Sequence, residues 1–96
     1  MFDNINKGLE EYKSTPGAVL VDVREPDEFA SGHIPGAVNL PLSGIQNVSF
    51  SKDTVMFIYC LRGSRSMRAV GILKKMGYQN VKSIGGINRY QGEIEK

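Results

Sequence analysis

The sequence predicts an α/β fold, a small three-layer sandwich in which helices flank a parallel sheet. Short apolar runs alternate along the chain with segments of helical periodicity, which is the order that βαβ crossovers require. The run at residues 18–23 is almost continuously apolar and β-branched, as expected for a strand covered on both faces. With 96 residues, of which 41% are hydrophobic, the chain fits one domain spanning residues 1–96.

The first half of the chain is predicted to hold a docking helix followed by alternating strands and short helices. Ile5, Leu9 and Tyr12 recur at helical spacing before a proline and a glycine break the pattern. Pro26 suits the first turn of a second helix. The predicted elements are a helix over residues 3–13, a strand over 18–23, a short helix over 26–29, a strand over 37–40 and one or two helical turns over 42–47.

The second half repeats this alternation. The predicted elements are a strand over residues 54–59, a helix over 66–76, a strand over 81–84 and a weak helix over 87–91. The apolar face of the longer helix consists of Met67, Val70, Leu73 and Met76. Gly77 is expected to end that helix in the left-handed conformation. Met56, Met67 and Met76 are interpreted as core residues.

The only cysteine of the chain, Cys60, follows the apolar run at residues 54–59. Ligands of open parallel sheets bind beyond the carboxyl ends of the strands, so an exposed nucleophile is expected here, at the end of a central strand. Gly63 lies in the turn that follows, and Arg62 and Arg65 flank it. Backbone amides, a helix N-terminus and two guanidinium groups can therefore stabilise a thiolate. The alternative is a small buried hydrophobic residue, because free cysteine is often buried.

Composition excludes several other kinds of site. A single cysteine excludes an internal disulfide, and a single histidine, His33, leaves no ligand set for zinc. We therefore predict no metal and no other cofactor. No apolar stretch approaches the ~20 residues that span a bilayer, and no apolar signal segment follows the N-terminus. These features predict a protein of the reducing cytoplasm that has no membrane partner.

The net charge of +2 hides an uneven distribution along the chain. Residues 1–53 hold eight acids and four bases, whereas residues 54–92 hold seven bases and no acid. For the two arginines beside Cys60, this predicts a positive field that attracts small anions. The lysines of the same stretch are interpreted as solvated surface residues. Nucleic acid is not expected as a partner, because no aromatic residues are interleaved with the bases.

Segments of this chain resemble, in order, the rhodanese homology domain, and together they cover about residues 18–90. The segments are DVREPDEF at residues 22–29, GHIPGAVNLP at 32–41, YCLRGSRS at 59–66 and the Gly-Gly pair at 85–86. The resemblance implies a five-stranded parallel sheet and a sulfurtransferase. In such an enzyme Cys60 would take sulfane sulfur from thiosulfate or a persulfide donor. The Cys60 persulfide would then pass that sulfur to cyanide or a cellular thiol.

The turn after Cys60 is the predicted active-site loop. Its residues are Leu61, Arg62, Gly63, Ser64, Arg65 and Ser66. Four residues separate Cys60 from Arg65, whereas related cell-cycle phosphatases and arsenate reductases use a loop one residue longer. The short loop suits a sulfur atom better than a tetrahedral phosphate. Cysteine-dependent phosphatase or arsenate reductase chemistry is therefore the less favoured alternative.

Two polar residues after the first predicted strand have two interpretations. Asp22 and Arg24 either form a buried ion pair that braces a loop, or support the cysteine loop from the neighbouring strand end. His33 lies in a turn and is interpreted as structural rather than as a general base. Ser66 is expected at the start of a helix with its hydroxyl near the sulfur. Arg68 is interpreted as a solvated helix residue.

Two positions depart from the rhodanese pattern. Tyr90 stands where the family commonly has tryptophan, so the closing segment is expected to pack differently. Leu61 stands where many members carry a polar or basic residue, which favours a protein or low-molecular-weight persulfide over thiosulfate. A sulfur-relay or binding module with little free turnover thus remains open beside an active enzyme. The expected partners are small sulfur-containing anions or a persulfide-carrying protein, and we expect a monomer.

Overall fold

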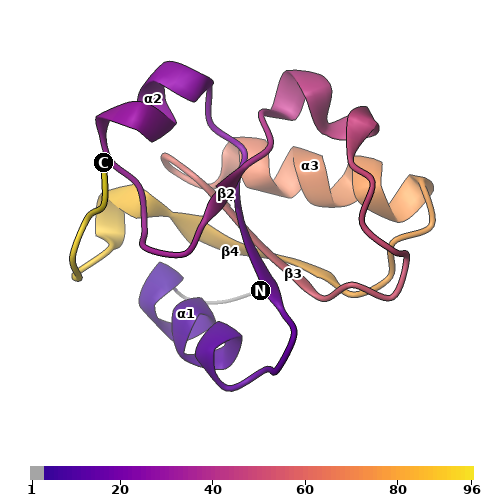
Figure 1. Cartoon of the computed structure of the whole chain (residues 1–96), viewed down its shortest axis with the longest axis horizontal. Helices are drawn as coiled ribbons and strands as arrows, with labels where there is room; N and C mark the ends of the chain where they lie inside the picture. Colours follow the sequence, from indigo (N-terminus) through magenta and orange to yellow (C-terminus); the bar gives the residue numbers. More distant parts are fainter. Residues whose placement is uncertain (1–3) are drawn as a thin grey trace.

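Parallel strands in the order β2-β1-β3-β4 form the sheet at the centre of the molecule (Figure 1). The computed structural model describes residues 4–96. The strands are β1 (Val19–Asp22), β2 (Val38–Asn39), β3 (Met56–Cys60) and β4 (Val81–Gly86). The helices are α1 (Ile5–Lys13), α2 (Pro26–Ser31) and α3 (Ser64–Lys75), with 3-10 helices η1 (Leu42–Asn47) and η2 (Ile87–Arg89). The predicted α/β class is confirmed, and the predicted first residue of α1, Asp3, lies outside the described residues.

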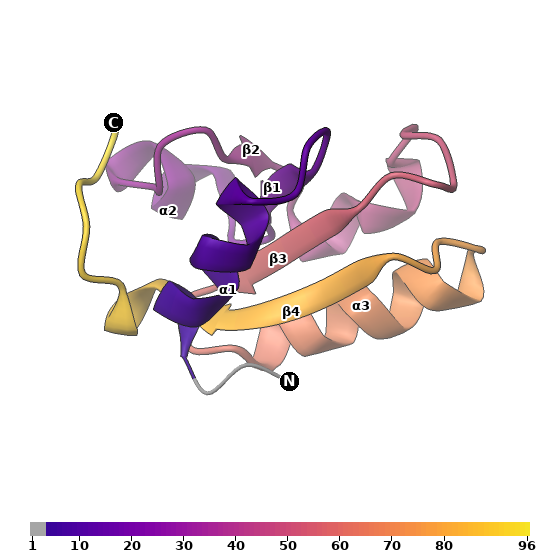
Figure 2. The same ribbon diagram turned by 90° about the horizontal axis from the view of Figure 1, so that it is seen from below.

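The sheet has four strands among the described residues, where the resemblance implied five. These strands correspond to the four apolar runs of the sequence, and the shortest, β2, has two residues. The C-terminal segment runs beside α2 (Figure 2) and adds only an isolated antiparallel bridge between His33 and Glu95. All four strands of this sheet therefore lie at apolar runs that the sequence predicts as strands.

Strand alternation divides the core into two layers. Met56, Ile58 and Cys60 of β3 lie in the cluster that packs on α3 and η1. Phe57 and Tyr59 point the other way, into the cluster with α1. Figure 1 shows α1 on one side of the sheet and α3 on the other. Because successive side chains of a strand face opposite sides, this register fixes Cys60 on the α3 side.

An irregularity in β4 brings its last residues to the end of β3. Ile58 pairs with Ser83, but Tyr59 pairs with Gly85, so β4 holds one extra residue between them. Gly85 adopts φ +106°, a conformation that glycine tolerates and other residues rarely do. Beyond this bulge, Gly86 pairs with Cys60. The carboxyl ends of the two strands therefore meet at the cysteine.

Helix α3 begins two residues earlier than predicted, at Ser64 rather than Ser66. Gly63 is its N-cap at φ +111°, which lets the chain turn from the strand into the helix within a very short loop. Gly77 follows the C-cap at φ +105°, which confirms the predicted helix end. The interpretation of Met67 as a core residue is wrong, because this side chain is 52% exposed. No helix within residues 4–96 is long and apolar enough to cross a membrane.

Candidate active site

The sulfur of Cys60 is held by the backbone of the loop that follows it. The amide of Gly63 donates to Sγ at 3.0 Å, and the amide of Ser66 donates to it at 3.3 Å. Both amides belong to the start of α3, where the helix has N–H groups without an acceptor inside the helix. The prediction that Cys60 is exposed is wrong, since its side chain is only 1% exposed. The thiol lies beneath its loop and not on the surface.

The Ser66 side chain links this sulfur to β4. Its Oγ lies 3.6 Å from Cys60 Sγ and 2.7 Å from Ser83 Oγ, and it donates to the Gly63 carbonyl at 2.9 Å. The prediction of a first-turn serine near the sulfur is confirmed. Ser83 was not predicted as part of the site. Its only signal in the sequence is its position two residues after the buried Val81, which places it on the α3 face of the strand.

The two arginines of the loop have different environments. Arg65 binds Glu28 of α2 with both ends of its guanidinium, at 2.7 and 3.1 Å. These hydrogen bonds lower the pKa of Glu28 to about 2 and raise the pKa of Arg65. Arg62 is exposed and has no hydrogen-bond or ion-pair partner within residues 4–96. Only Arg62 therefore offers an unpaired charge from the loop to an incoming anion.

Glu28 is a residue of the site that the sequence did not identify. In sequence it looks like an ordinary acid of a helix N-terminus, and its side chain does close a capping box with Glu25. No local pattern indicated that the start of α2 lies against the start of α3. The pairing with Arg65 joins two segments 37 positions apart.

The end of β4 holds the outer part of the cysteine loop. A Cβ on Gly86 would overlap the carbonyl oxygen of Leu61 and lie 2.6 Å from Arg62 Cα. The amide of Asn88 donates to the same Leu61 carbonyl at 3.1 Å. The side chain of Leu61 is 36% exposed. Absence of a side chain at position 86 thus allows the loop to pack directly on the strand.

Asp22 and Arg24 form the buried ion pair of the first interpretation. The Arg24 guanidinium donates to both Asp22 oxygens, and its Nη2 also donates to the Gly32 carbonyl at 2.7 Å. Burial acts to lower the pKa of Arg24, but the hydrogen bonds and charge of Asp22 outweigh it and raise that pKa. Asp22 pairs in register with Tyr59, whose side chain faces the α1 layer. Among the described contacts, this pair braces the loop before β2 and does not touch the cysteine loop.

His33 and Arg68 also behave as their structural interpretations predicted. His33 is buried, its Nδ1 lies 2.9 Å from the Phe29 carbonyl, and its ring stacks on Phe29 at 3.7 Å. Arg68 is an exposed residue of α3. Within residues 4–96, no cluster of three or more acidic, histidine or cysteine side chains could hold a metal ion.

Comparisons with known proteins identify the family. The model of the rhodanese-like domain matches residues 5–93. The Bacillus subtilis protein YqhL is 40% identical over 97 residues, which cover 95% of this chain and 77% of that protein. The Escherichia coli thiosulfate sulfurtransferase PspE is 38% identical over 72 residues, 70% of this chain and 68% of that protein. Some relatives are much longer, since the match covers only 23% of the Ogataea parapolymorpha protein named adenylyltransferase and sulfurtransferase uba4, at 31% identity.

Solved structures agree with this assignment. A rhodanese-like domain protein from Staphylococcus aureus has a TM-score of 0.82 at 30% identity, covering 96% of this chain and 93% of that one. The structure described as rhodanese with anions from E. coli has a TM-score of 0.74 at 30% identity, covering 82% and 98%. With its parallel sheet and its cysteine loop at the end of β3, the chain belongs to the family of rhodanese-like domains.

Proposed function

We propose that this protein is a sulfurtransferase that carries sulfane sulfur on Cys60. The observation that carries the proposal is the position of Cys60 Sγ. This sulfur accepts hydrogen bonds from the backbone amides of Gly63 and Ser66 at the N-terminus of α3. Backbone amides at a helix N-terminus can donate to a negatively charged sulfur, which is the form of the nucleophile and of the persulfide in sulfur transfer. Relatives named thiosulfate sulfurtransferase and sulfurtransferase support the same activity.

The reaction proceeds in two displacements without net oxidation of the protein. The Cys60 thiolate attacks the outer sulfur of thiosulfate, so that a Cys60–sulfur bond forms, the sulfur–sulfur bond of thiosulfate breaks and sulfite leaves with the electron pair. Cyanide or a cellular thiolate then attacks the outer sulfur of the persulfide, and the Cys60 thiolate leaves. No cofactor is needed, since the cysteine carries the group itself.

The loop stabilises the charge on the transferred sulfur. Within this loop, the amides of Gly63 and Ser66 point at the Cys60 sulfur, and we expect them to hold the transferred sulfur in the manner of an oxyanion hole. The arginine that a phosphate would need, Arg65, already binds Glu28 through both of its terminal nitrogens, Nη1 and Nη2. This arrangement favours a single sulfur atom over a tetrahedral anion. Cys60-dependent turnover of an aryl phosphate would contradict that preference.

Steady-state kinetics test the proposal. Thiocyanate formation from thiosulfate and cyanide should give parallel double-reciprocal lines, because the first product leaves before the second substrate binds. The Cys60→Ser variant should form no thiocyanate above background. Intersecting lines, or activity that survives in Cys60→Ser, would refute a covalent sulfur carrier.

A sulfur relay between proteins is the second candidate. Two apolar side chains near the loop are exposed, since Leu61 of the loop is 36% exposed and Met67 of α3 is 52% exposed. Such exposed apolar side chains favour contact with another protein over capture of a small anion. We would then expect slow turnover of thiosulfate and fast transfer from a persulfidated donor protein. Equal efficiency with both donors would count against the relay.

A further inference from the structure

An open pocket of about 490 Å³ lies directly against the cysteine loop. The loop contributes one wall through Arg62, Gly63 and Ser64, and α3 adds the exposed Met67. The opposite wall comes from the end of β4 and from η2, including Arg89. A molecule in this pocket therefore lies next to the backbone that surrounds Cys60.

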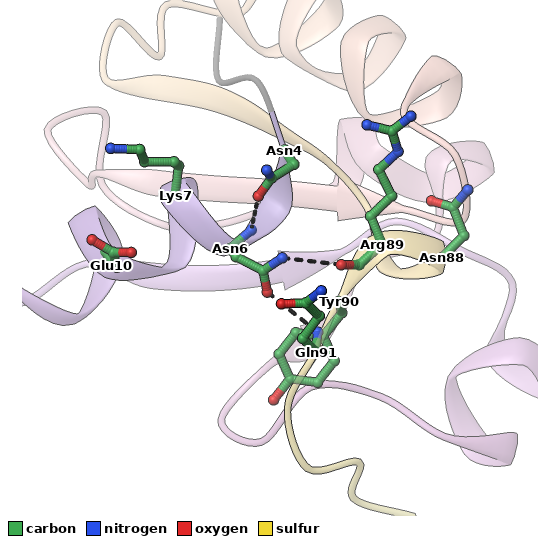
Figure 3. A pocket seen from close by; sticks show the side chains of 8 residues that line it. All are labelled: Asn4, Asn6, Lys7, Glu10, Asn88, Arg89, Tyr90 and Gln91. Atoms are coloured by element: carbon green, nitrogen blue, oxygen red, sulfur yellow. Dashed lines mark hydrogen bonds between the residues drawn. The ribbon is translucent and has the colours of Figure 1, made fainter.

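A second pocket of about 560 Å³ lies between α1 and η2, next to the first. Three residues, Asn4, Asn88 and Arg89, line both pockets. Figure 3 shows the side chains of Asn88 and Arg89 extending from η2, while Gln91 lies against Asn6 of α1. Asn6 holds the two segments together, because it donates to the Arg89 carbonyl and accepts from the Gln91 amide. We call the two adjacent pockets together the loop groove.

The loop groove is basic at its end near Cys60. Arg62 and Arg89 line the pocket beside the loop, and none of the lining residues described within residues 4–96 is acidic. Within residues 4–96, neither guanidinium has a hydrogen-bond or ion-pair partner. Lys7 adds a third base further along, and Glu10 is the one acid that lines the second pocket among the described residues. A ligand with negative charge near its sulfur-bearing end matches this distribution.

The remaining lining favours a peptide over a small anion. The side-chain amides of Asn88 and Gln91 each offer a donor and an acceptor, which complement the acceptor and donor of a peptide group. Asn4 offers its amide donor, because its oxygen accepts from the Asn6 amide at the start of α1. Each pocket alone has the size that suits a drug-sized ligand. Thiosulfate would occupy only the end beside Arg62. A chain-like ligand is needed to use the whole groove.

We infer that the loop groove binds an extended, acidic peptide segment of the protein that delivers sulfur to Cys60. This inference rests on the proposed function. The segment carries a cysteine persulfide whose outer sulfur lies beside Gly63, the residue whose amide donates to Cys60 Sγ, while its carboxylates lie against Arg62 and Arg89. The Cys60 thiolate attacks that outer sulfur, the donor's sulfur–sulfur bond breaks, and the donor cysteine leaves as a thiolate with the electron pair. No oxidant or reductant takes part.

A synthetic peptide with one cysteine persulfide between glutamates tests the inference, with a matched peptide in which glutamines replace the glutamates. The rate of sulfur loading on Cys60, followed by intact-protein mass, should be about fivefold higher with the acidic peptide. That advantage should shrink as salt is added, because the groove is open to solvent. Equal rates with the two peptides would overturn the inference.

The variant Arg89→Gln locates the effect in the groove. It should lower kcat/KM for the acidic peptide about fivefold more than it lowers kcat/KM for thiosulfate. Lys75→Gln makes the same charge change at an exposed position of α3 outside both pockets, and it should affect neither reaction. Equal losses in Arg89→Gln and Lys75→Gln would show that net charge, not the groove, is responsible.

A binding measurement separates this inference from the proposed function. A fluorescent acidic peptide with serine in place of its cysteine should bind Cys60→Ser protein, and Arg89→Gln should weaken that binding about fivefold. Failure of thiosulfate to load Cys60, with peptide binding intact, would reject only the proposed chemistry. Normal loading by thiosulfate without peptide binding would reject only the groove.

Discussion

The carboxyl ends of β1 and β3 lie side by side in the sheet, but the first carries a buried ion pair and the second carries a cysteine. At the end of β1, Asp22 and Arg24 satisfy each other and the Gly32 carbonyl in a buried network. At the end of β3, the Cys60 sulfur accepts hydrogen bonds from the backbone amides of Gly63 and Ser66. In the first network, each charged side chain is paired with the other. In the second, backbone amides and the Ser66 hydroxyl contact a single sulfur atom.

Strand alternation explains why these neighbours do not cooperate. Asp22 pairs with Tyr59, one residue before Cys60, and so faces the α1 layer. Cys60 faces α3 on the other side of the sheet. Proximity at the carboxyl edge of a parallel sheet therefore does not by itself bring two side chains into one site. The face of the sheet decides which of them meet.

Removal of one charge from the β1 network should have the largest effect on stability. Asp22→Asn leaves the Arg24 guanidinium buried without a counter-ion, and we expect a loss of about 3–5 kcal/mol in the free energy of unfolding. Urea unfolding measures this, with the exposed Asp53→Asn as a control of equal charge change. The double variant Asp22→Asn/Arg24→Met removes both charges and should recover part of the loss. A single variant as stable as Asp53→Asn would show that the pair does not brace the fold.

Displacement of the cysteine loop from β4 should mainly reduce sulfur loading at the end of β3. Gly86→Ala places a methyl group against Leu61 and Arg62, which we expect to cost about 1–3 kcal/mol of stability and to slow sulfur loading about 100-fold. Gly71→Ala on α3 is the matched control, because a Cβ there meets no atom within 4 Å. That control should be as stable as the parent or more so. Parent-like loading in Gly86→Ala would mean that the loop does not depend on this contact.

The ion pair between Glu28 of α2 and Arg65 of the cysteine loop predicts that the free energy of unfolding depends on pH. The folded protein lowers the pKa of Glu28 from its ordinary 4.5 to about 2, so the pair stabilises the fold above pH 4.5 and loses that contribution as the pH falls toward 2. Because both side chains are about one third exposed, we expect Glu28→Gln to cost only about 1 kcal/mol at pH 7. The stability gap to the parent should close between pH 4.5 and 2. A gap that is constant with pH would exclude the ionised carboxylate as its source.

The smallest effect is expected at Ser83. Ser83→Ala removes one partner of Ser66, which still contacts Cys60 and the Gly63 carbonyl. We expect sulfur loading to slow about threefold, compared with no change in the exposed Ser43→Ala. Stopped-flow or quenched loading assays resolve this difference. A loss as large as that of Gly86→Ala would instead make Ser83 a main determinant of the site.

The sequence predicts the elements and the position of the cysteine loop well, because both depend on local patterns. The apolar runs mark the four strands, and Gly63 with Ser66 marks the start of a helix after Cys60. The charge pattern along the sequence was less informative. Residues 54–92 contain no acid, but in the folded chain an acid from the first half lies against them. Glu28 from the acidic half neutralises Arg65 across the fold. The burial of Cys60 and the contact with Gly86 likewise depend on the meeting of β3, β4 and α3, which no single segment encodes.

Intact-protein mass spectrometry after incubation with thiosulfate tests the role of the β3 end most directly. Since Cys60 is the only cysteine in the chain, its substitution leaves no other thiol to carry sulfur. We predict the mass of one added sulfur atom on the parent, its removal by cyanide and no adduct on Cys60→Ser. An adduct of equal size on Cys60→Ser, or no adduct on the parent with any sulfane donor, would contradict a persulfide at Cys60.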